Sequence, residues 1–286
     1  MQLQVAIHLR YIGMDYTIKS SQLQLTVTDE GGSMRSLIYL PTGEERLWQG
    51  GSAWGSRDVV IFPIIGHAQP YTVNGVTYTP KSHGVVRYSK LKVVDIGDSF
   101  IQFSLEENDE TLKTYPFAFL FMLRYELRQN SLKVTYFVQS KEGKMPFYVG
   151  GHPGLKAPGG EAVIEFSGGN SAVEYPLGQD CSRSMEIHRL VANKELFKEC
   201  KTLQLGGLTG DITASTADGF NYTFYANCPV WAFWSNEEEG DYVCIEPWWG
   251  INDFPAAPRE LSLKPLINFD DGAGQAFSYM LTITKD

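Results

Sequence analysis

The sequence is poor in cysteine and in basic residues, and it has no long hydrophobic run. Its four cysteines, at positions 181, 200, 228 and 244, show no Cys-x-x-Cys spacing. This pattern predicts neither a disulfide framework nor a structural zinc site, and we expect reduced, partly buried thiols. Lys and Arg total 24 against 33 Asp and Glu, a net charge of -9. That balance disfavours nucleic-acid binding along a phosphate backbone.

Membrane and export signals are missing from the sequence as well. No apolar stretch reaches the roughly 18 to 20 residues that a membrane-spanning helix needs. The segment 1–10 has no basic leader, and a histidine and an arginine interrupt its short apolar run. We therefore predict a cytoplasmic protein that does not bind membranes.

Several common enzyme motifs are also absent. The sequence contains no Gly-x-Gly-x-x-Gly, no P-loop, no His-Glu-x-x-His and no Gly-x-Ser-x-Gly. The nucleotide-binding, zinc-protease and α/β-hydrolase classes therefore lose support. With 286 residues, the chain is long enough to bury a large core, in one large β domain or in two smaller domains.

Alternation of apolar and polar residues dominates the chain and predicts half-buried β-strands. The alternation is clearest over 23–27 and 132–138. Further strand-like runs are found at 36–40, 100–105, 119–127, 163–166, 222–226, 230–234, 242–245 and 277–284. Turn residues separate many of these runs, which predicts an antiparallel architecture with a hairpin turn at Gln129–Asn130.

Helical signal is sparse. The best candidate is the segment 193–200, where Asn193 can cap the first turn and Leu196, Phe197 and Cys200 share one face. No stretch has the composition of a linker or a regular repeat, and strand-like alternation continues to the last residues. We therefore predict a single all-β domain with one or two short helices.

Two histidines lie beside glycine in settings that suit a binding cleft. His83 is followed by Gly84 at a strand edge, where glycine lets a ligand approach the backbone closely. An ordinary loop histidine is the alternative there. His152 lies in the segment 148–155, which contains three glycines and a proline. A histidine in such a rigid loop suits a positioned acid or base.

Glu246 ends an apolar strand and is followed by Pro247, Trp248 and Trp249. Burial would raise the pKa of its carboxyl towards neutrality, nearby hydrogen-bond donors would lower it, and either balance could make it a base. The alternative is a glutamate that caps a turn beside core tryptophans. Tryptophan faces also stack on the apolar faces of sugars, so Trp248 and Trp249 fit a carbohydrate cleft as well as a core.

In combination, these segments resemble the aldose 1-epimerase (galactose mutarotase) superfamily, most closely its LacX-like branch. The resemblance extends from about Met14 to the carboxyl end. It rests on the segments 60–66, 83–87, 151–154 and 244–249. Residues 1–13 precede the usual start of the family and are expected to be a non-catalytic extension or a start-site artefact. Residues 14–286 are then a single galactose mutarotase-like domain.

The resemblance implies a large antiparallel β-sandwich with an open sugar cleft. The family reaction interconverts the α and β anomers of an aldose by opening the ring, and it needs no cofactor and no metal. One group removes the proton of the C1 hydroxyl while another protonates the ring oxygen. By position in the motifs, Glu246 resembles the general base and His152 the general acid. His83 resembles a second cleft histidine that bonds the sugar.

Five further positions are implied as substrate contacts. Arg87 either contacts the sugar or packs behind the His83 loop. His67 stands where relatives commonly have an arginine, which leaves sugar specificity open, and Arg57 might supply the missing guanidinium. Asp211 is a candidate for a hydroxyl contact or an ordinary turn residue. Trp248 is the candidate for stacking on the sugar.

The leading hypothesis is an isomerase that acts on a free hexose. A non-catalytic carbohydrate-binding protein is the alternative from another class, although binding alone does not need an acid–base pair. A sugar-phosphate mutarotase would need clustered cations at the cleft, and only Arg57, Arg87 and Lys81 are close in the motifs. The expected partner is a small-molecule sugar, and the protein is expected to be a monomer or a homodimer.

Overall fold

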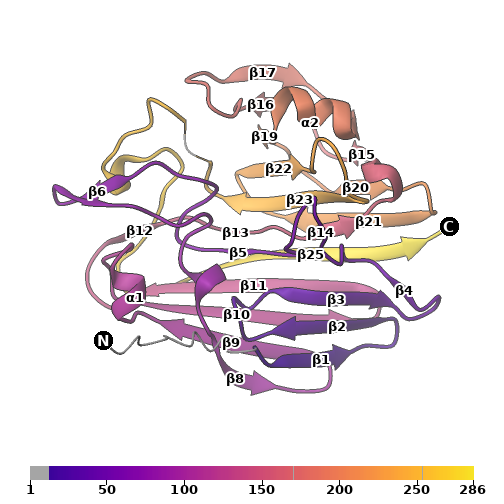
Figure 1. The fold of residues 1–286 in the computed structure, drawn as a ribbon, viewed down its shortest axis with the longest axis horizontal. Coiled ribbons are helices and arrows are strands. Elements are labelled where there is room, and N and C mark those ends of the chain that lie inside the picture. Colours follow the sequence, from indigo (N-terminus) through magenta and orange to yellow (C-terminus); the bar gives the residue numbers. More distant parts are fainter. Residues whose placement is uncertain (1–12, 170, 253) are drawn as a thin grey trace, which may run out of the picture.

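Every strand predicted from alternation is present in the computed structural model, which describes residues 13–169, 171–252 and 254–286. The named strands pair antiparallel throughout. They form two layers, a long sheet behind and two shorter sheets in front of it (Figure 1). This architecture confirms the expected all-β sandwich.

The rear layer is a nine-stranded sheet in the order β18-β15-β20-β21-β25-β11-β10-β9-β8. Its strands are β8 (Lys92–Ile96), β9 (Phe100–Glu106), β10 (Phe119–Arg128), β11 (Ser131–Ser140), β15 (Ala162–Phe166), β18 (Arg189–Ala192), β20 (Ile212–Ser215), β21 (Phe220–Ala226) and β25 (Gln275–Lys285). Burial alternates residue by residue along β10 and β11. The predicted hairpin turn joins these two strands, with Arg128 paired to Ser131.

The front layer consists of a four-stranded and an eight-stranded sheet. The four-stranded sheet contains β1 (Asp15–Lys19), β2 (Leu23–Thr28), β3 (Met34–Tyr39) and β4 (Glu44–Glu45). The eight-stranded sheet contains β5 (Val60–Ile61), β13 (Val149–Gly151), β14 (Gly154–Lys156), β16 (Ser171–Glu174), β17 (Arg183–Glu186), β19 (Leu203–Gly206), β22 (Val230–Trp234) and β23 (Tyr242–Trp249). β23 pairs with three of these, namely β22, β13 and β14.

The remaining elements are short. Two small sheets pair β12 (Met145–Phe147) with β24 (Asn268–Asp270) and β6 (Tyr71–Val73) with β7 (Val76–Tyr78). The α-helices are α1 (Asp109–Leu112) and α2 (Lys194–Cys200). Asn193 caps α2 by accepting a hydrogen bond from the Leu196 N–H, as predicted. Three 3-10 turns occur at η1 (Val86–Tyr88), η2 (Pro158–Gly160) and η3 (Leu261–Leu263).

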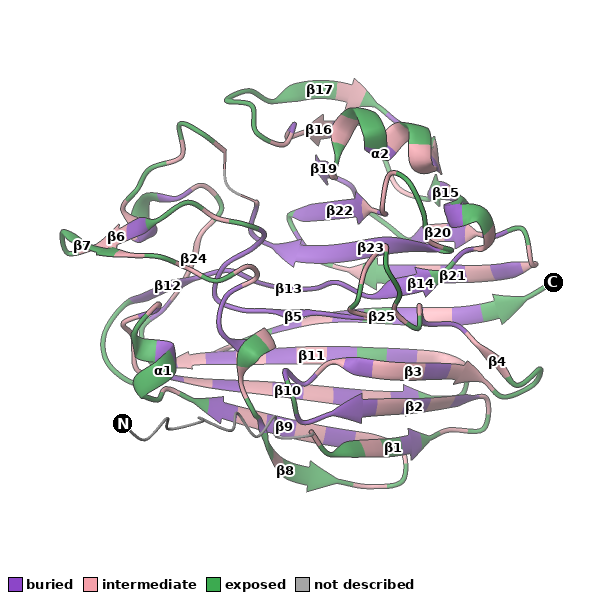
Figure 2. Ribbon diagram, in the orientation of Figure 1, coloured by how far each residue is buried: buried purple, intermediate pink, exposed green. Residues whose placement is uncertain are grey.

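Aromatic side chains fill the space between the layers. Tyr16 of the four-stranded sheet meets Phe103 of the rear sheet, and Trp249 of β23 packs on Phe277. Figure 2 shows β23 buried along its whole length, whereas the edge strand β8 is mostly exposed. Because β23 is covered on both faces, polar residues on it must find partners within the protein or in a ligand.

Two expectations about the chain as a whole can be compared with the structure. All four cysteines are free thiols, with Cys228 and Cys244 buried and Cys181 exposed. Among the described residues, no helix has the length and apolar character needed to cross a membrane. The predicted extension at 1–13 lies almost entirely outside the described residues, so its role stays a prediction.

Candidate active site

The alternation of β23 sends its residues to two different environments. Ile245 and Trp249 face the core between the layers, where the Trp249 indole donates a hydrogen bond to the Asn227 carbonyl over 2.8 Å. Glu246 and Trp248 lie on the opposite face. The period of two therefore separates the two tryptophans, and only Trp248 reaches the candidate site.

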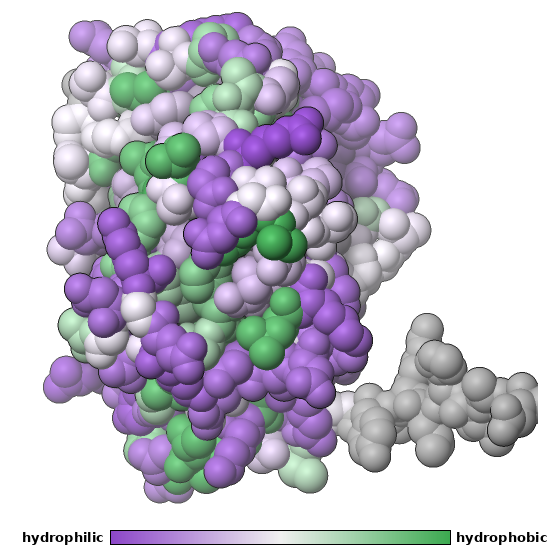
Figure 3. Space-filling model, turned by 90° about the vertical axis from the view of Figure 1, so that its left-hand side faces the viewer, coloured by the Kyte–Doolittle hydropathy of each residue, from purple (hydrophilic) through white to green (hydrophobic). Residues whose placement is uncertain are grey.

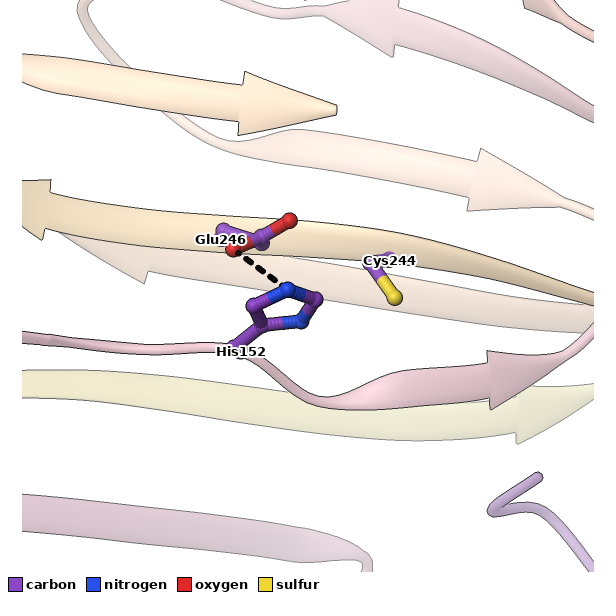
Figure 4. Close-up of side chains that lie close together, drawn as sticks. All are labelled: His152, Cys244 and Glu246. Atoms are coloured by element: carbon purple, nitrogen blue, oxygen red, sulfur yellow. Dashed lines mark ion pairs between the residues drawn. The ribbon is translucent and has the colours of Figure 1, made fainter. Parts of the chain in front are cut away.

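His152 faces Glu246 from the short connection between β13 and β14. Its Nε2 atom lies 3.4 Å from Oε2 of Glu246 (Figure 4). The imidazole stacks on Trp54 with ring centroids 5.0 Å apart, and Trp234 meets its edge at 5.6 Å. The side chains of His152 and Glu246 are only 9% and 1% exposed. Two tryptophans thus hold the imidazole in place against a buried carboxyl.

His83 approaches the same pair from another loop. Its ring meets that of His152 edge-on at 5.2 Å, and its Nδ1 atom accepts a hydrogen bond from the Gly66 N–H over 3.3 Å. Gly84 has a positive φ of 83°, and a Cβ there would lie 2.2 Å from the carbonyl oxygen of Phe62. The backbone geometry of this loop thus requires a glycine directly after His83.

These groups line one cavity of about 420 Å³, which we call the active-site cavity. Six of the residues predicted as site residues lie there, namely His67, His83, Arg87, His152, Glu246 and Trp248. They come from four separate parts of the chain, so the sandwich fold brings them together.

Burial controls the protonation of the central pair. It raises the pKa of the Glu246 carboxyl well above its ordinary value. The nearby Trp248 indole N–H opposes this rise in pKa, whereas the charge of Asp58 increases it. Burial lowers the pKa of His152 well below its ordinary value, and the charge that His83 carries when it is protonated and the charge of Arg87 act in the same direction. Both groups are therefore driven towards their neutral forms, in which the pair holds one proton.

His83 differs from His152 in its hydrogen bonding. Burial lowers the pKa of His83 to about 3, and the charges of Arg87 and His67 contribute to this shift. His83 is thus neutral at neutral pH. Because its Nδ1 atom accepts from Gly66, the remaining proton resides on Nε2, which leaves a fixed hydrogen-bond donor at the cavity.

Several buried polar atoms of the cavity have no hydrogen-bond partner among the described residues. They are both carboxylate oxygens of Glu246, Nδ1 of His152, Nε1 of Trp248 and Oγ of Ser82. Each unpaired buried polar atom ordinarily costs about 1–3 kcal/mol. Their concentration in one cavity indicates a site that is completed by a polar ligand.

Two predicted contacts lie elsewhere. Arg57 lines a neighbouring cavity of about 270 Å³, the arginine cavity, which also includes Arg87 and Arg35. Arg57 does not line the active-site cavity, so its contact with a sugar stays a prediction. Asp211 is exposed and joins a turn, where its N–H donates to Oγ of Ser167 over 2.7 Å. It does not line the active-site cavity.

Other lining residues were missed by the sequence analysis. Trp54 and Trp234 frame His152, and Asn252 lies at the rim of the cavity. The sequence could have identified Trp54 as a site residue, since it is a lone tryptophan in the glycine-rich segment 50–56. Trp234 was assigned to a strand without a functional role, and nothing local distinguishes Asn252 from other loop residues.

Three atoms that can bind metals lie close together at the pair. The ligand atoms of His152, Cys244 and Glu246 are all within 4.8 Å of one another, and Figure 4 shows Cys244 beside the imidazole. Burial raises the pKa of the Cys244 thiol well above its ordinary value. Binding a cation there would require removal of that proton, so we assign no metal role to this cluster.

Comparison with known proteins places the fold in the galactose mutarotase-like class. The chain superimposes on a galactose mutarotase-related enzyme of Lactobacillus acidophilus with a TM-score of 0.88 and 29% identity, covering 95% of this chain and 98% of the other. The galactose 1-epimerase of Lactobacillus acidophilus NCFM superimposes with a TM-score of 0.71 at 12% identity, covering 96% and 95%. At that identity the second likeness concerns the fold alone.

The sequence comparisons give the family. The family model for aldose 1-epimerase matches residues 14–247. The chromosomally encoded protein LacX of Lactococcus lactis subsp. lactis is 24% identical, covering 89% of this chain and 94% of the relative. The chain belongs to the aldose 1-epimerase family and is similar to its LacX proteins.

Proposed function

We propose that the protein is an aldose 1-epimerase that interconverts the α and β anomers of a free hexose. The observation that carries this proposal is the buried contact of His152 and Glu246, with Nε2 and Oε2 separated by 3.4 Å and the carboxylate oxygens unpaired. A sugar-binding module needs hydrogen-bond donors and flat rings, whereas a buried pair that shares one proton suits acid–base chemistry.

In the proposed reaction, the Glu246 carboxylate takes the proton of the C1 hydroxyl and the His152 imidazolium gives its proton to the ring oxygen. The bond between C1 and the ring oxygen breaks, and C1 becomes an aldehyde. Rotation about the C1–C2 bond exposes the other face of the aldehyde. The C5 hydroxyl then adds to it, returns its proton to His152, and Glu246 protonates the new C1 oxygen.

The opposite pKa shifts of the two groups support this assignment. A carboxylate with a raised pKa is a stronger base, and an imidazolium with a lowered pKa is a stronger acid. After ring opening both groups are neutral, the forms that burial favours. The fixed Nε2–H donor of His83 is suited to stabilise negative charge that develops on a sugar oxygen.

The experiment follows the anomeric protons of freshly dissolved α-D-galactose and α-D-glucose by NMR. Wild-type protein should accelerate mutarotation, and His152→Gln should lower the catalysed rate by about 10²–10⁴. His188→Gln is the matched control, because His188 is exposed and lies outside the cavity. It should keep wild-type activity.

Two results would overturn parts of the proposal. If wild type binds the sugars without accelerating mutarotation, the protein is a carbohydrate-binding protein. If wild type accelerates the reaction and His152→Gln is fully active, the enzyme class stands and His152 is not the acid.

A phosphorylated aldose is a second candidate substrate, favoured by the arginine cavity. Arg57 and Arg87 line that cavity, neither forms an ion pair within the described part of the chain, and Nε of Arg57 is buried without a partner. Two such guanidinium groups suit a phosphate. A preference for glucose 6-phosphate over glucose of tenfold or more that Arg57→Met abolishes would support this candidate, and equal rates would exclude it.

A further inference from the structure

Three tryptophans and a tyrosine gather beside His152. Trp54 stacks on the imidazole, and the rings of Trp234 and Tyr242 lie against Trp54 with centroid distances of 5.3 Å and 5.4 Å. Trp48 completes the cluster by packing on Tyr242. The exterior seen in Figure 3 carries its hydrophobic residues in small groups among hydrophilic ones. In the active site, by contrast, aromatic packing is concentrated at one titratable side chain.

Trp54 is fixed in place by contacts with two other segments. Its carbonyl accepts hydrogen bonds from the Trp48 indole N–H over 2.8 Å and from the Gly51 N–H over 3.1 Å. Gly154 lies directly against the Trp54 indole, because a Cβ at position 154 would be 2.5 Å from its Cζ3 atom. A side chain there would displace the indole. The glycine two residues after His152 is therefore needed for the two rings to stack.

Ionisable groups of both signs surround the imidazole. They come from three parts of the chain: Asp58, His83 with Arg87, and Cys244 with Glu246. Glu246 approaches the Nε2 atom of His152, while the Nδ1 atom has no hydrogen-bond partner among the described residues. A positive charge on this ring therefore depends on the Glu246 carboxylate and on the aromatic faces beside it.

The face of the Trp54 indole attracts a cation. A positive charge within about 6 Å above the face of a tryptophan is stabilised by the electrons of the ring, most strongly where water is excluded. The planes of His152 and Trp54 are inclined by only 26°, so the imidazole lies over the indole face. A neutral imidazole in the same place lacks this charge interaction. The contact therefore favours the protonated imidazole, whereas burial favours the neutral one.

We propose that Trp54 is a positioning residue that favours the charge-separated form of the His152–Glu246 pair, in which the proton resides on His152. This inference rests on the proposed function, because the proposed reaction begins from an imidazolium and a carboxylate. Burial favours the other form, in which the carboxyl holds the proton and both groups are neutral. Stacking on the indole offsets part of that preference, so the form that can open the sugar ring stays populated.

The first test locates the proton by NMR and does not depend on turnover. In protein labelled with ¹⁵N-histidine and ¹³C-glutamate, the shifts of the His152 ring nitrogens and of the Glu246 carboxyl carbon report the average of the two forms. At pH 7, Trp54→Leu should lower the ratio of the charge-separated form to the neutral form about tenfold. Trp54→Phe keeps an aromatic face and should recover most of this ratio. Shifts in Trp54→Leu that equal those of wild type would overturn the proposal.

The matched control is Trp48→Leu, which removes a ring of the same size from the same cluster. The Trp48 indole packs on Tyr242 at 4.9 Å and holds the Trp54 carbonyl, but its ring does not stack on His152. This variant loosens the loop without removing the face that the imidazole contacts. The ratio of the two forms should therefore stay within about twofold of wild type. An equal change in Trp48→Leu and Trp54→Leu would show that loop packing, and not the Trp54 face, controls the proton.

The second test follows mutarotation in the same variants. At pH 7, kcat/KM should fall about tenfold in Trp54→Leu, in proportion to the charge-separated form, and should largely recover in Trp54→Phe. If the NMR shifts change as expected and wild type turns over no sugar, the proposed function fails while the role of Trp54 stands. If wild type turns over sugar and the shifts of Trp54→Leu equal those of wild type, the role of Trp54 is wrong while the proposed function stands. A loss of kcat/KM with unchanged shifts would make Trp54 a substrate contact instead.

Discussion

Asp58 and Glu246 are both buried carboxyl groups near His152, but their oxygen atoms have different partners. Oδ2 of Asp58 accepts a hydrogen bond from the Met34 N–H over 2.9 Å, and the backbone N–H groups of Val59 and His152 also donate to this carboxyl. Glu246 has no hydrogen-bond partner for either oxygen among the described residues. One carboxyl is therefore built into the backbone, and the other faces the cavity.

The difference is visible in the pKa values. Burial raises the pKa of Asp58 only to about 6, because three backbone N–H groups stabilise its ionised form. Burial raises the pKa of Glu246 well above its ordinary value, and only the nearby Trp248 indole N–H opposes this shift. A carboxyl held by backbone donors organises the loop that carries His152, whereas a carboxyl without them is ready to exchange a proton.

The largest expected effect is on catalysis. Glu246→Gln keeps the size of the side chain but cannot accept a proton, so the catalysed mutarotation rate should fall by about 10²–10⁴. Sugar binding, measured by titration, should be largely retained. Glu165→Gln, at an exposed position on β15, is the control and should have wild-type activity. A fully active Glu246→Gln protein would show that another group is the base.

The same variant, which should lose activity, should gain stability at high pH. A raised pKa in the folded state means that the free energy of unfolding falls as pH rises from the ordinary value of Glu246 through its folded-state value. Glu246→Gln should therefore be as stable as wild type at pH 4 and more stable at pH 8, as measured by urea unfolding. A loss of stability at pH 8 would indicate that the carboxylate has partners in the folded protein.

Asp58→Ala tests the other carboxyl. It leaves the N–H groups of Met34, Val59 and His152 without an acceptor. We expect a loss of about 2 kcal/mol in the free energy of unfolding at pH 7. The loss should be smaller than the cost of leaving these N–H groups fully desolvated, because the site borders the arginine cavity. Asp58→Asn keeps one acceptor and should lose less. Unchanged stability in Asp58→Ala would contradict the structural role.

The pH dependence of stability tests His83. Its pKa is lowered to about 3, so its contribution to stability is complete above pH 6.5 and is lost as pH falls from there towards 3. His83→Asn keeps a residue that tolerates the positive φ of 62°. Between pH 7 and pH 4 this variant should lose about 2 kcal/mol less than wild type in urea unfolding. Parallel pH curves would place His83 in a solvated setting.

The smallest expected effect concerns His67, which lies at the open end of the cavity and is exposed. Arginine offers more hydrogen-bond donors, in different directions, than an imidazole. His67→Arg should change the relative rates among hexoses and pentoses by a few-fold, up to about tenfold. Identical relative rates across the panel would show that position 67 does not contact the sugar.

Local patterns in the sequence determined much of this structure. Period-two alternation located the strands, and it placed Glu246 and Trp248 on one face of β23 because successive side chains of a strand point to opposite sides. Asn193 predicted the start of α2 because its side chain can accept a hydrogen bond from a free backbone N–H of the first turn. The resemblance to the family then selected His83, His152 and Glu246, which share one cavity.

The tertiary structure decided what surrounds those residues. No local period in the sequence encodes the placement of residues that depends on how distant segments pack. Examples are Arg57 at the arginine cavity, the exposed Asp211 and the tryptophans around His152. The same holds for the contact of Gly66 with Asn252, 186 positions apart in the sequence, in the wall of the active-site cavity. Strand alternation arises from the geometry of a single strand, whereas a cleft arises where loops from several strands meet.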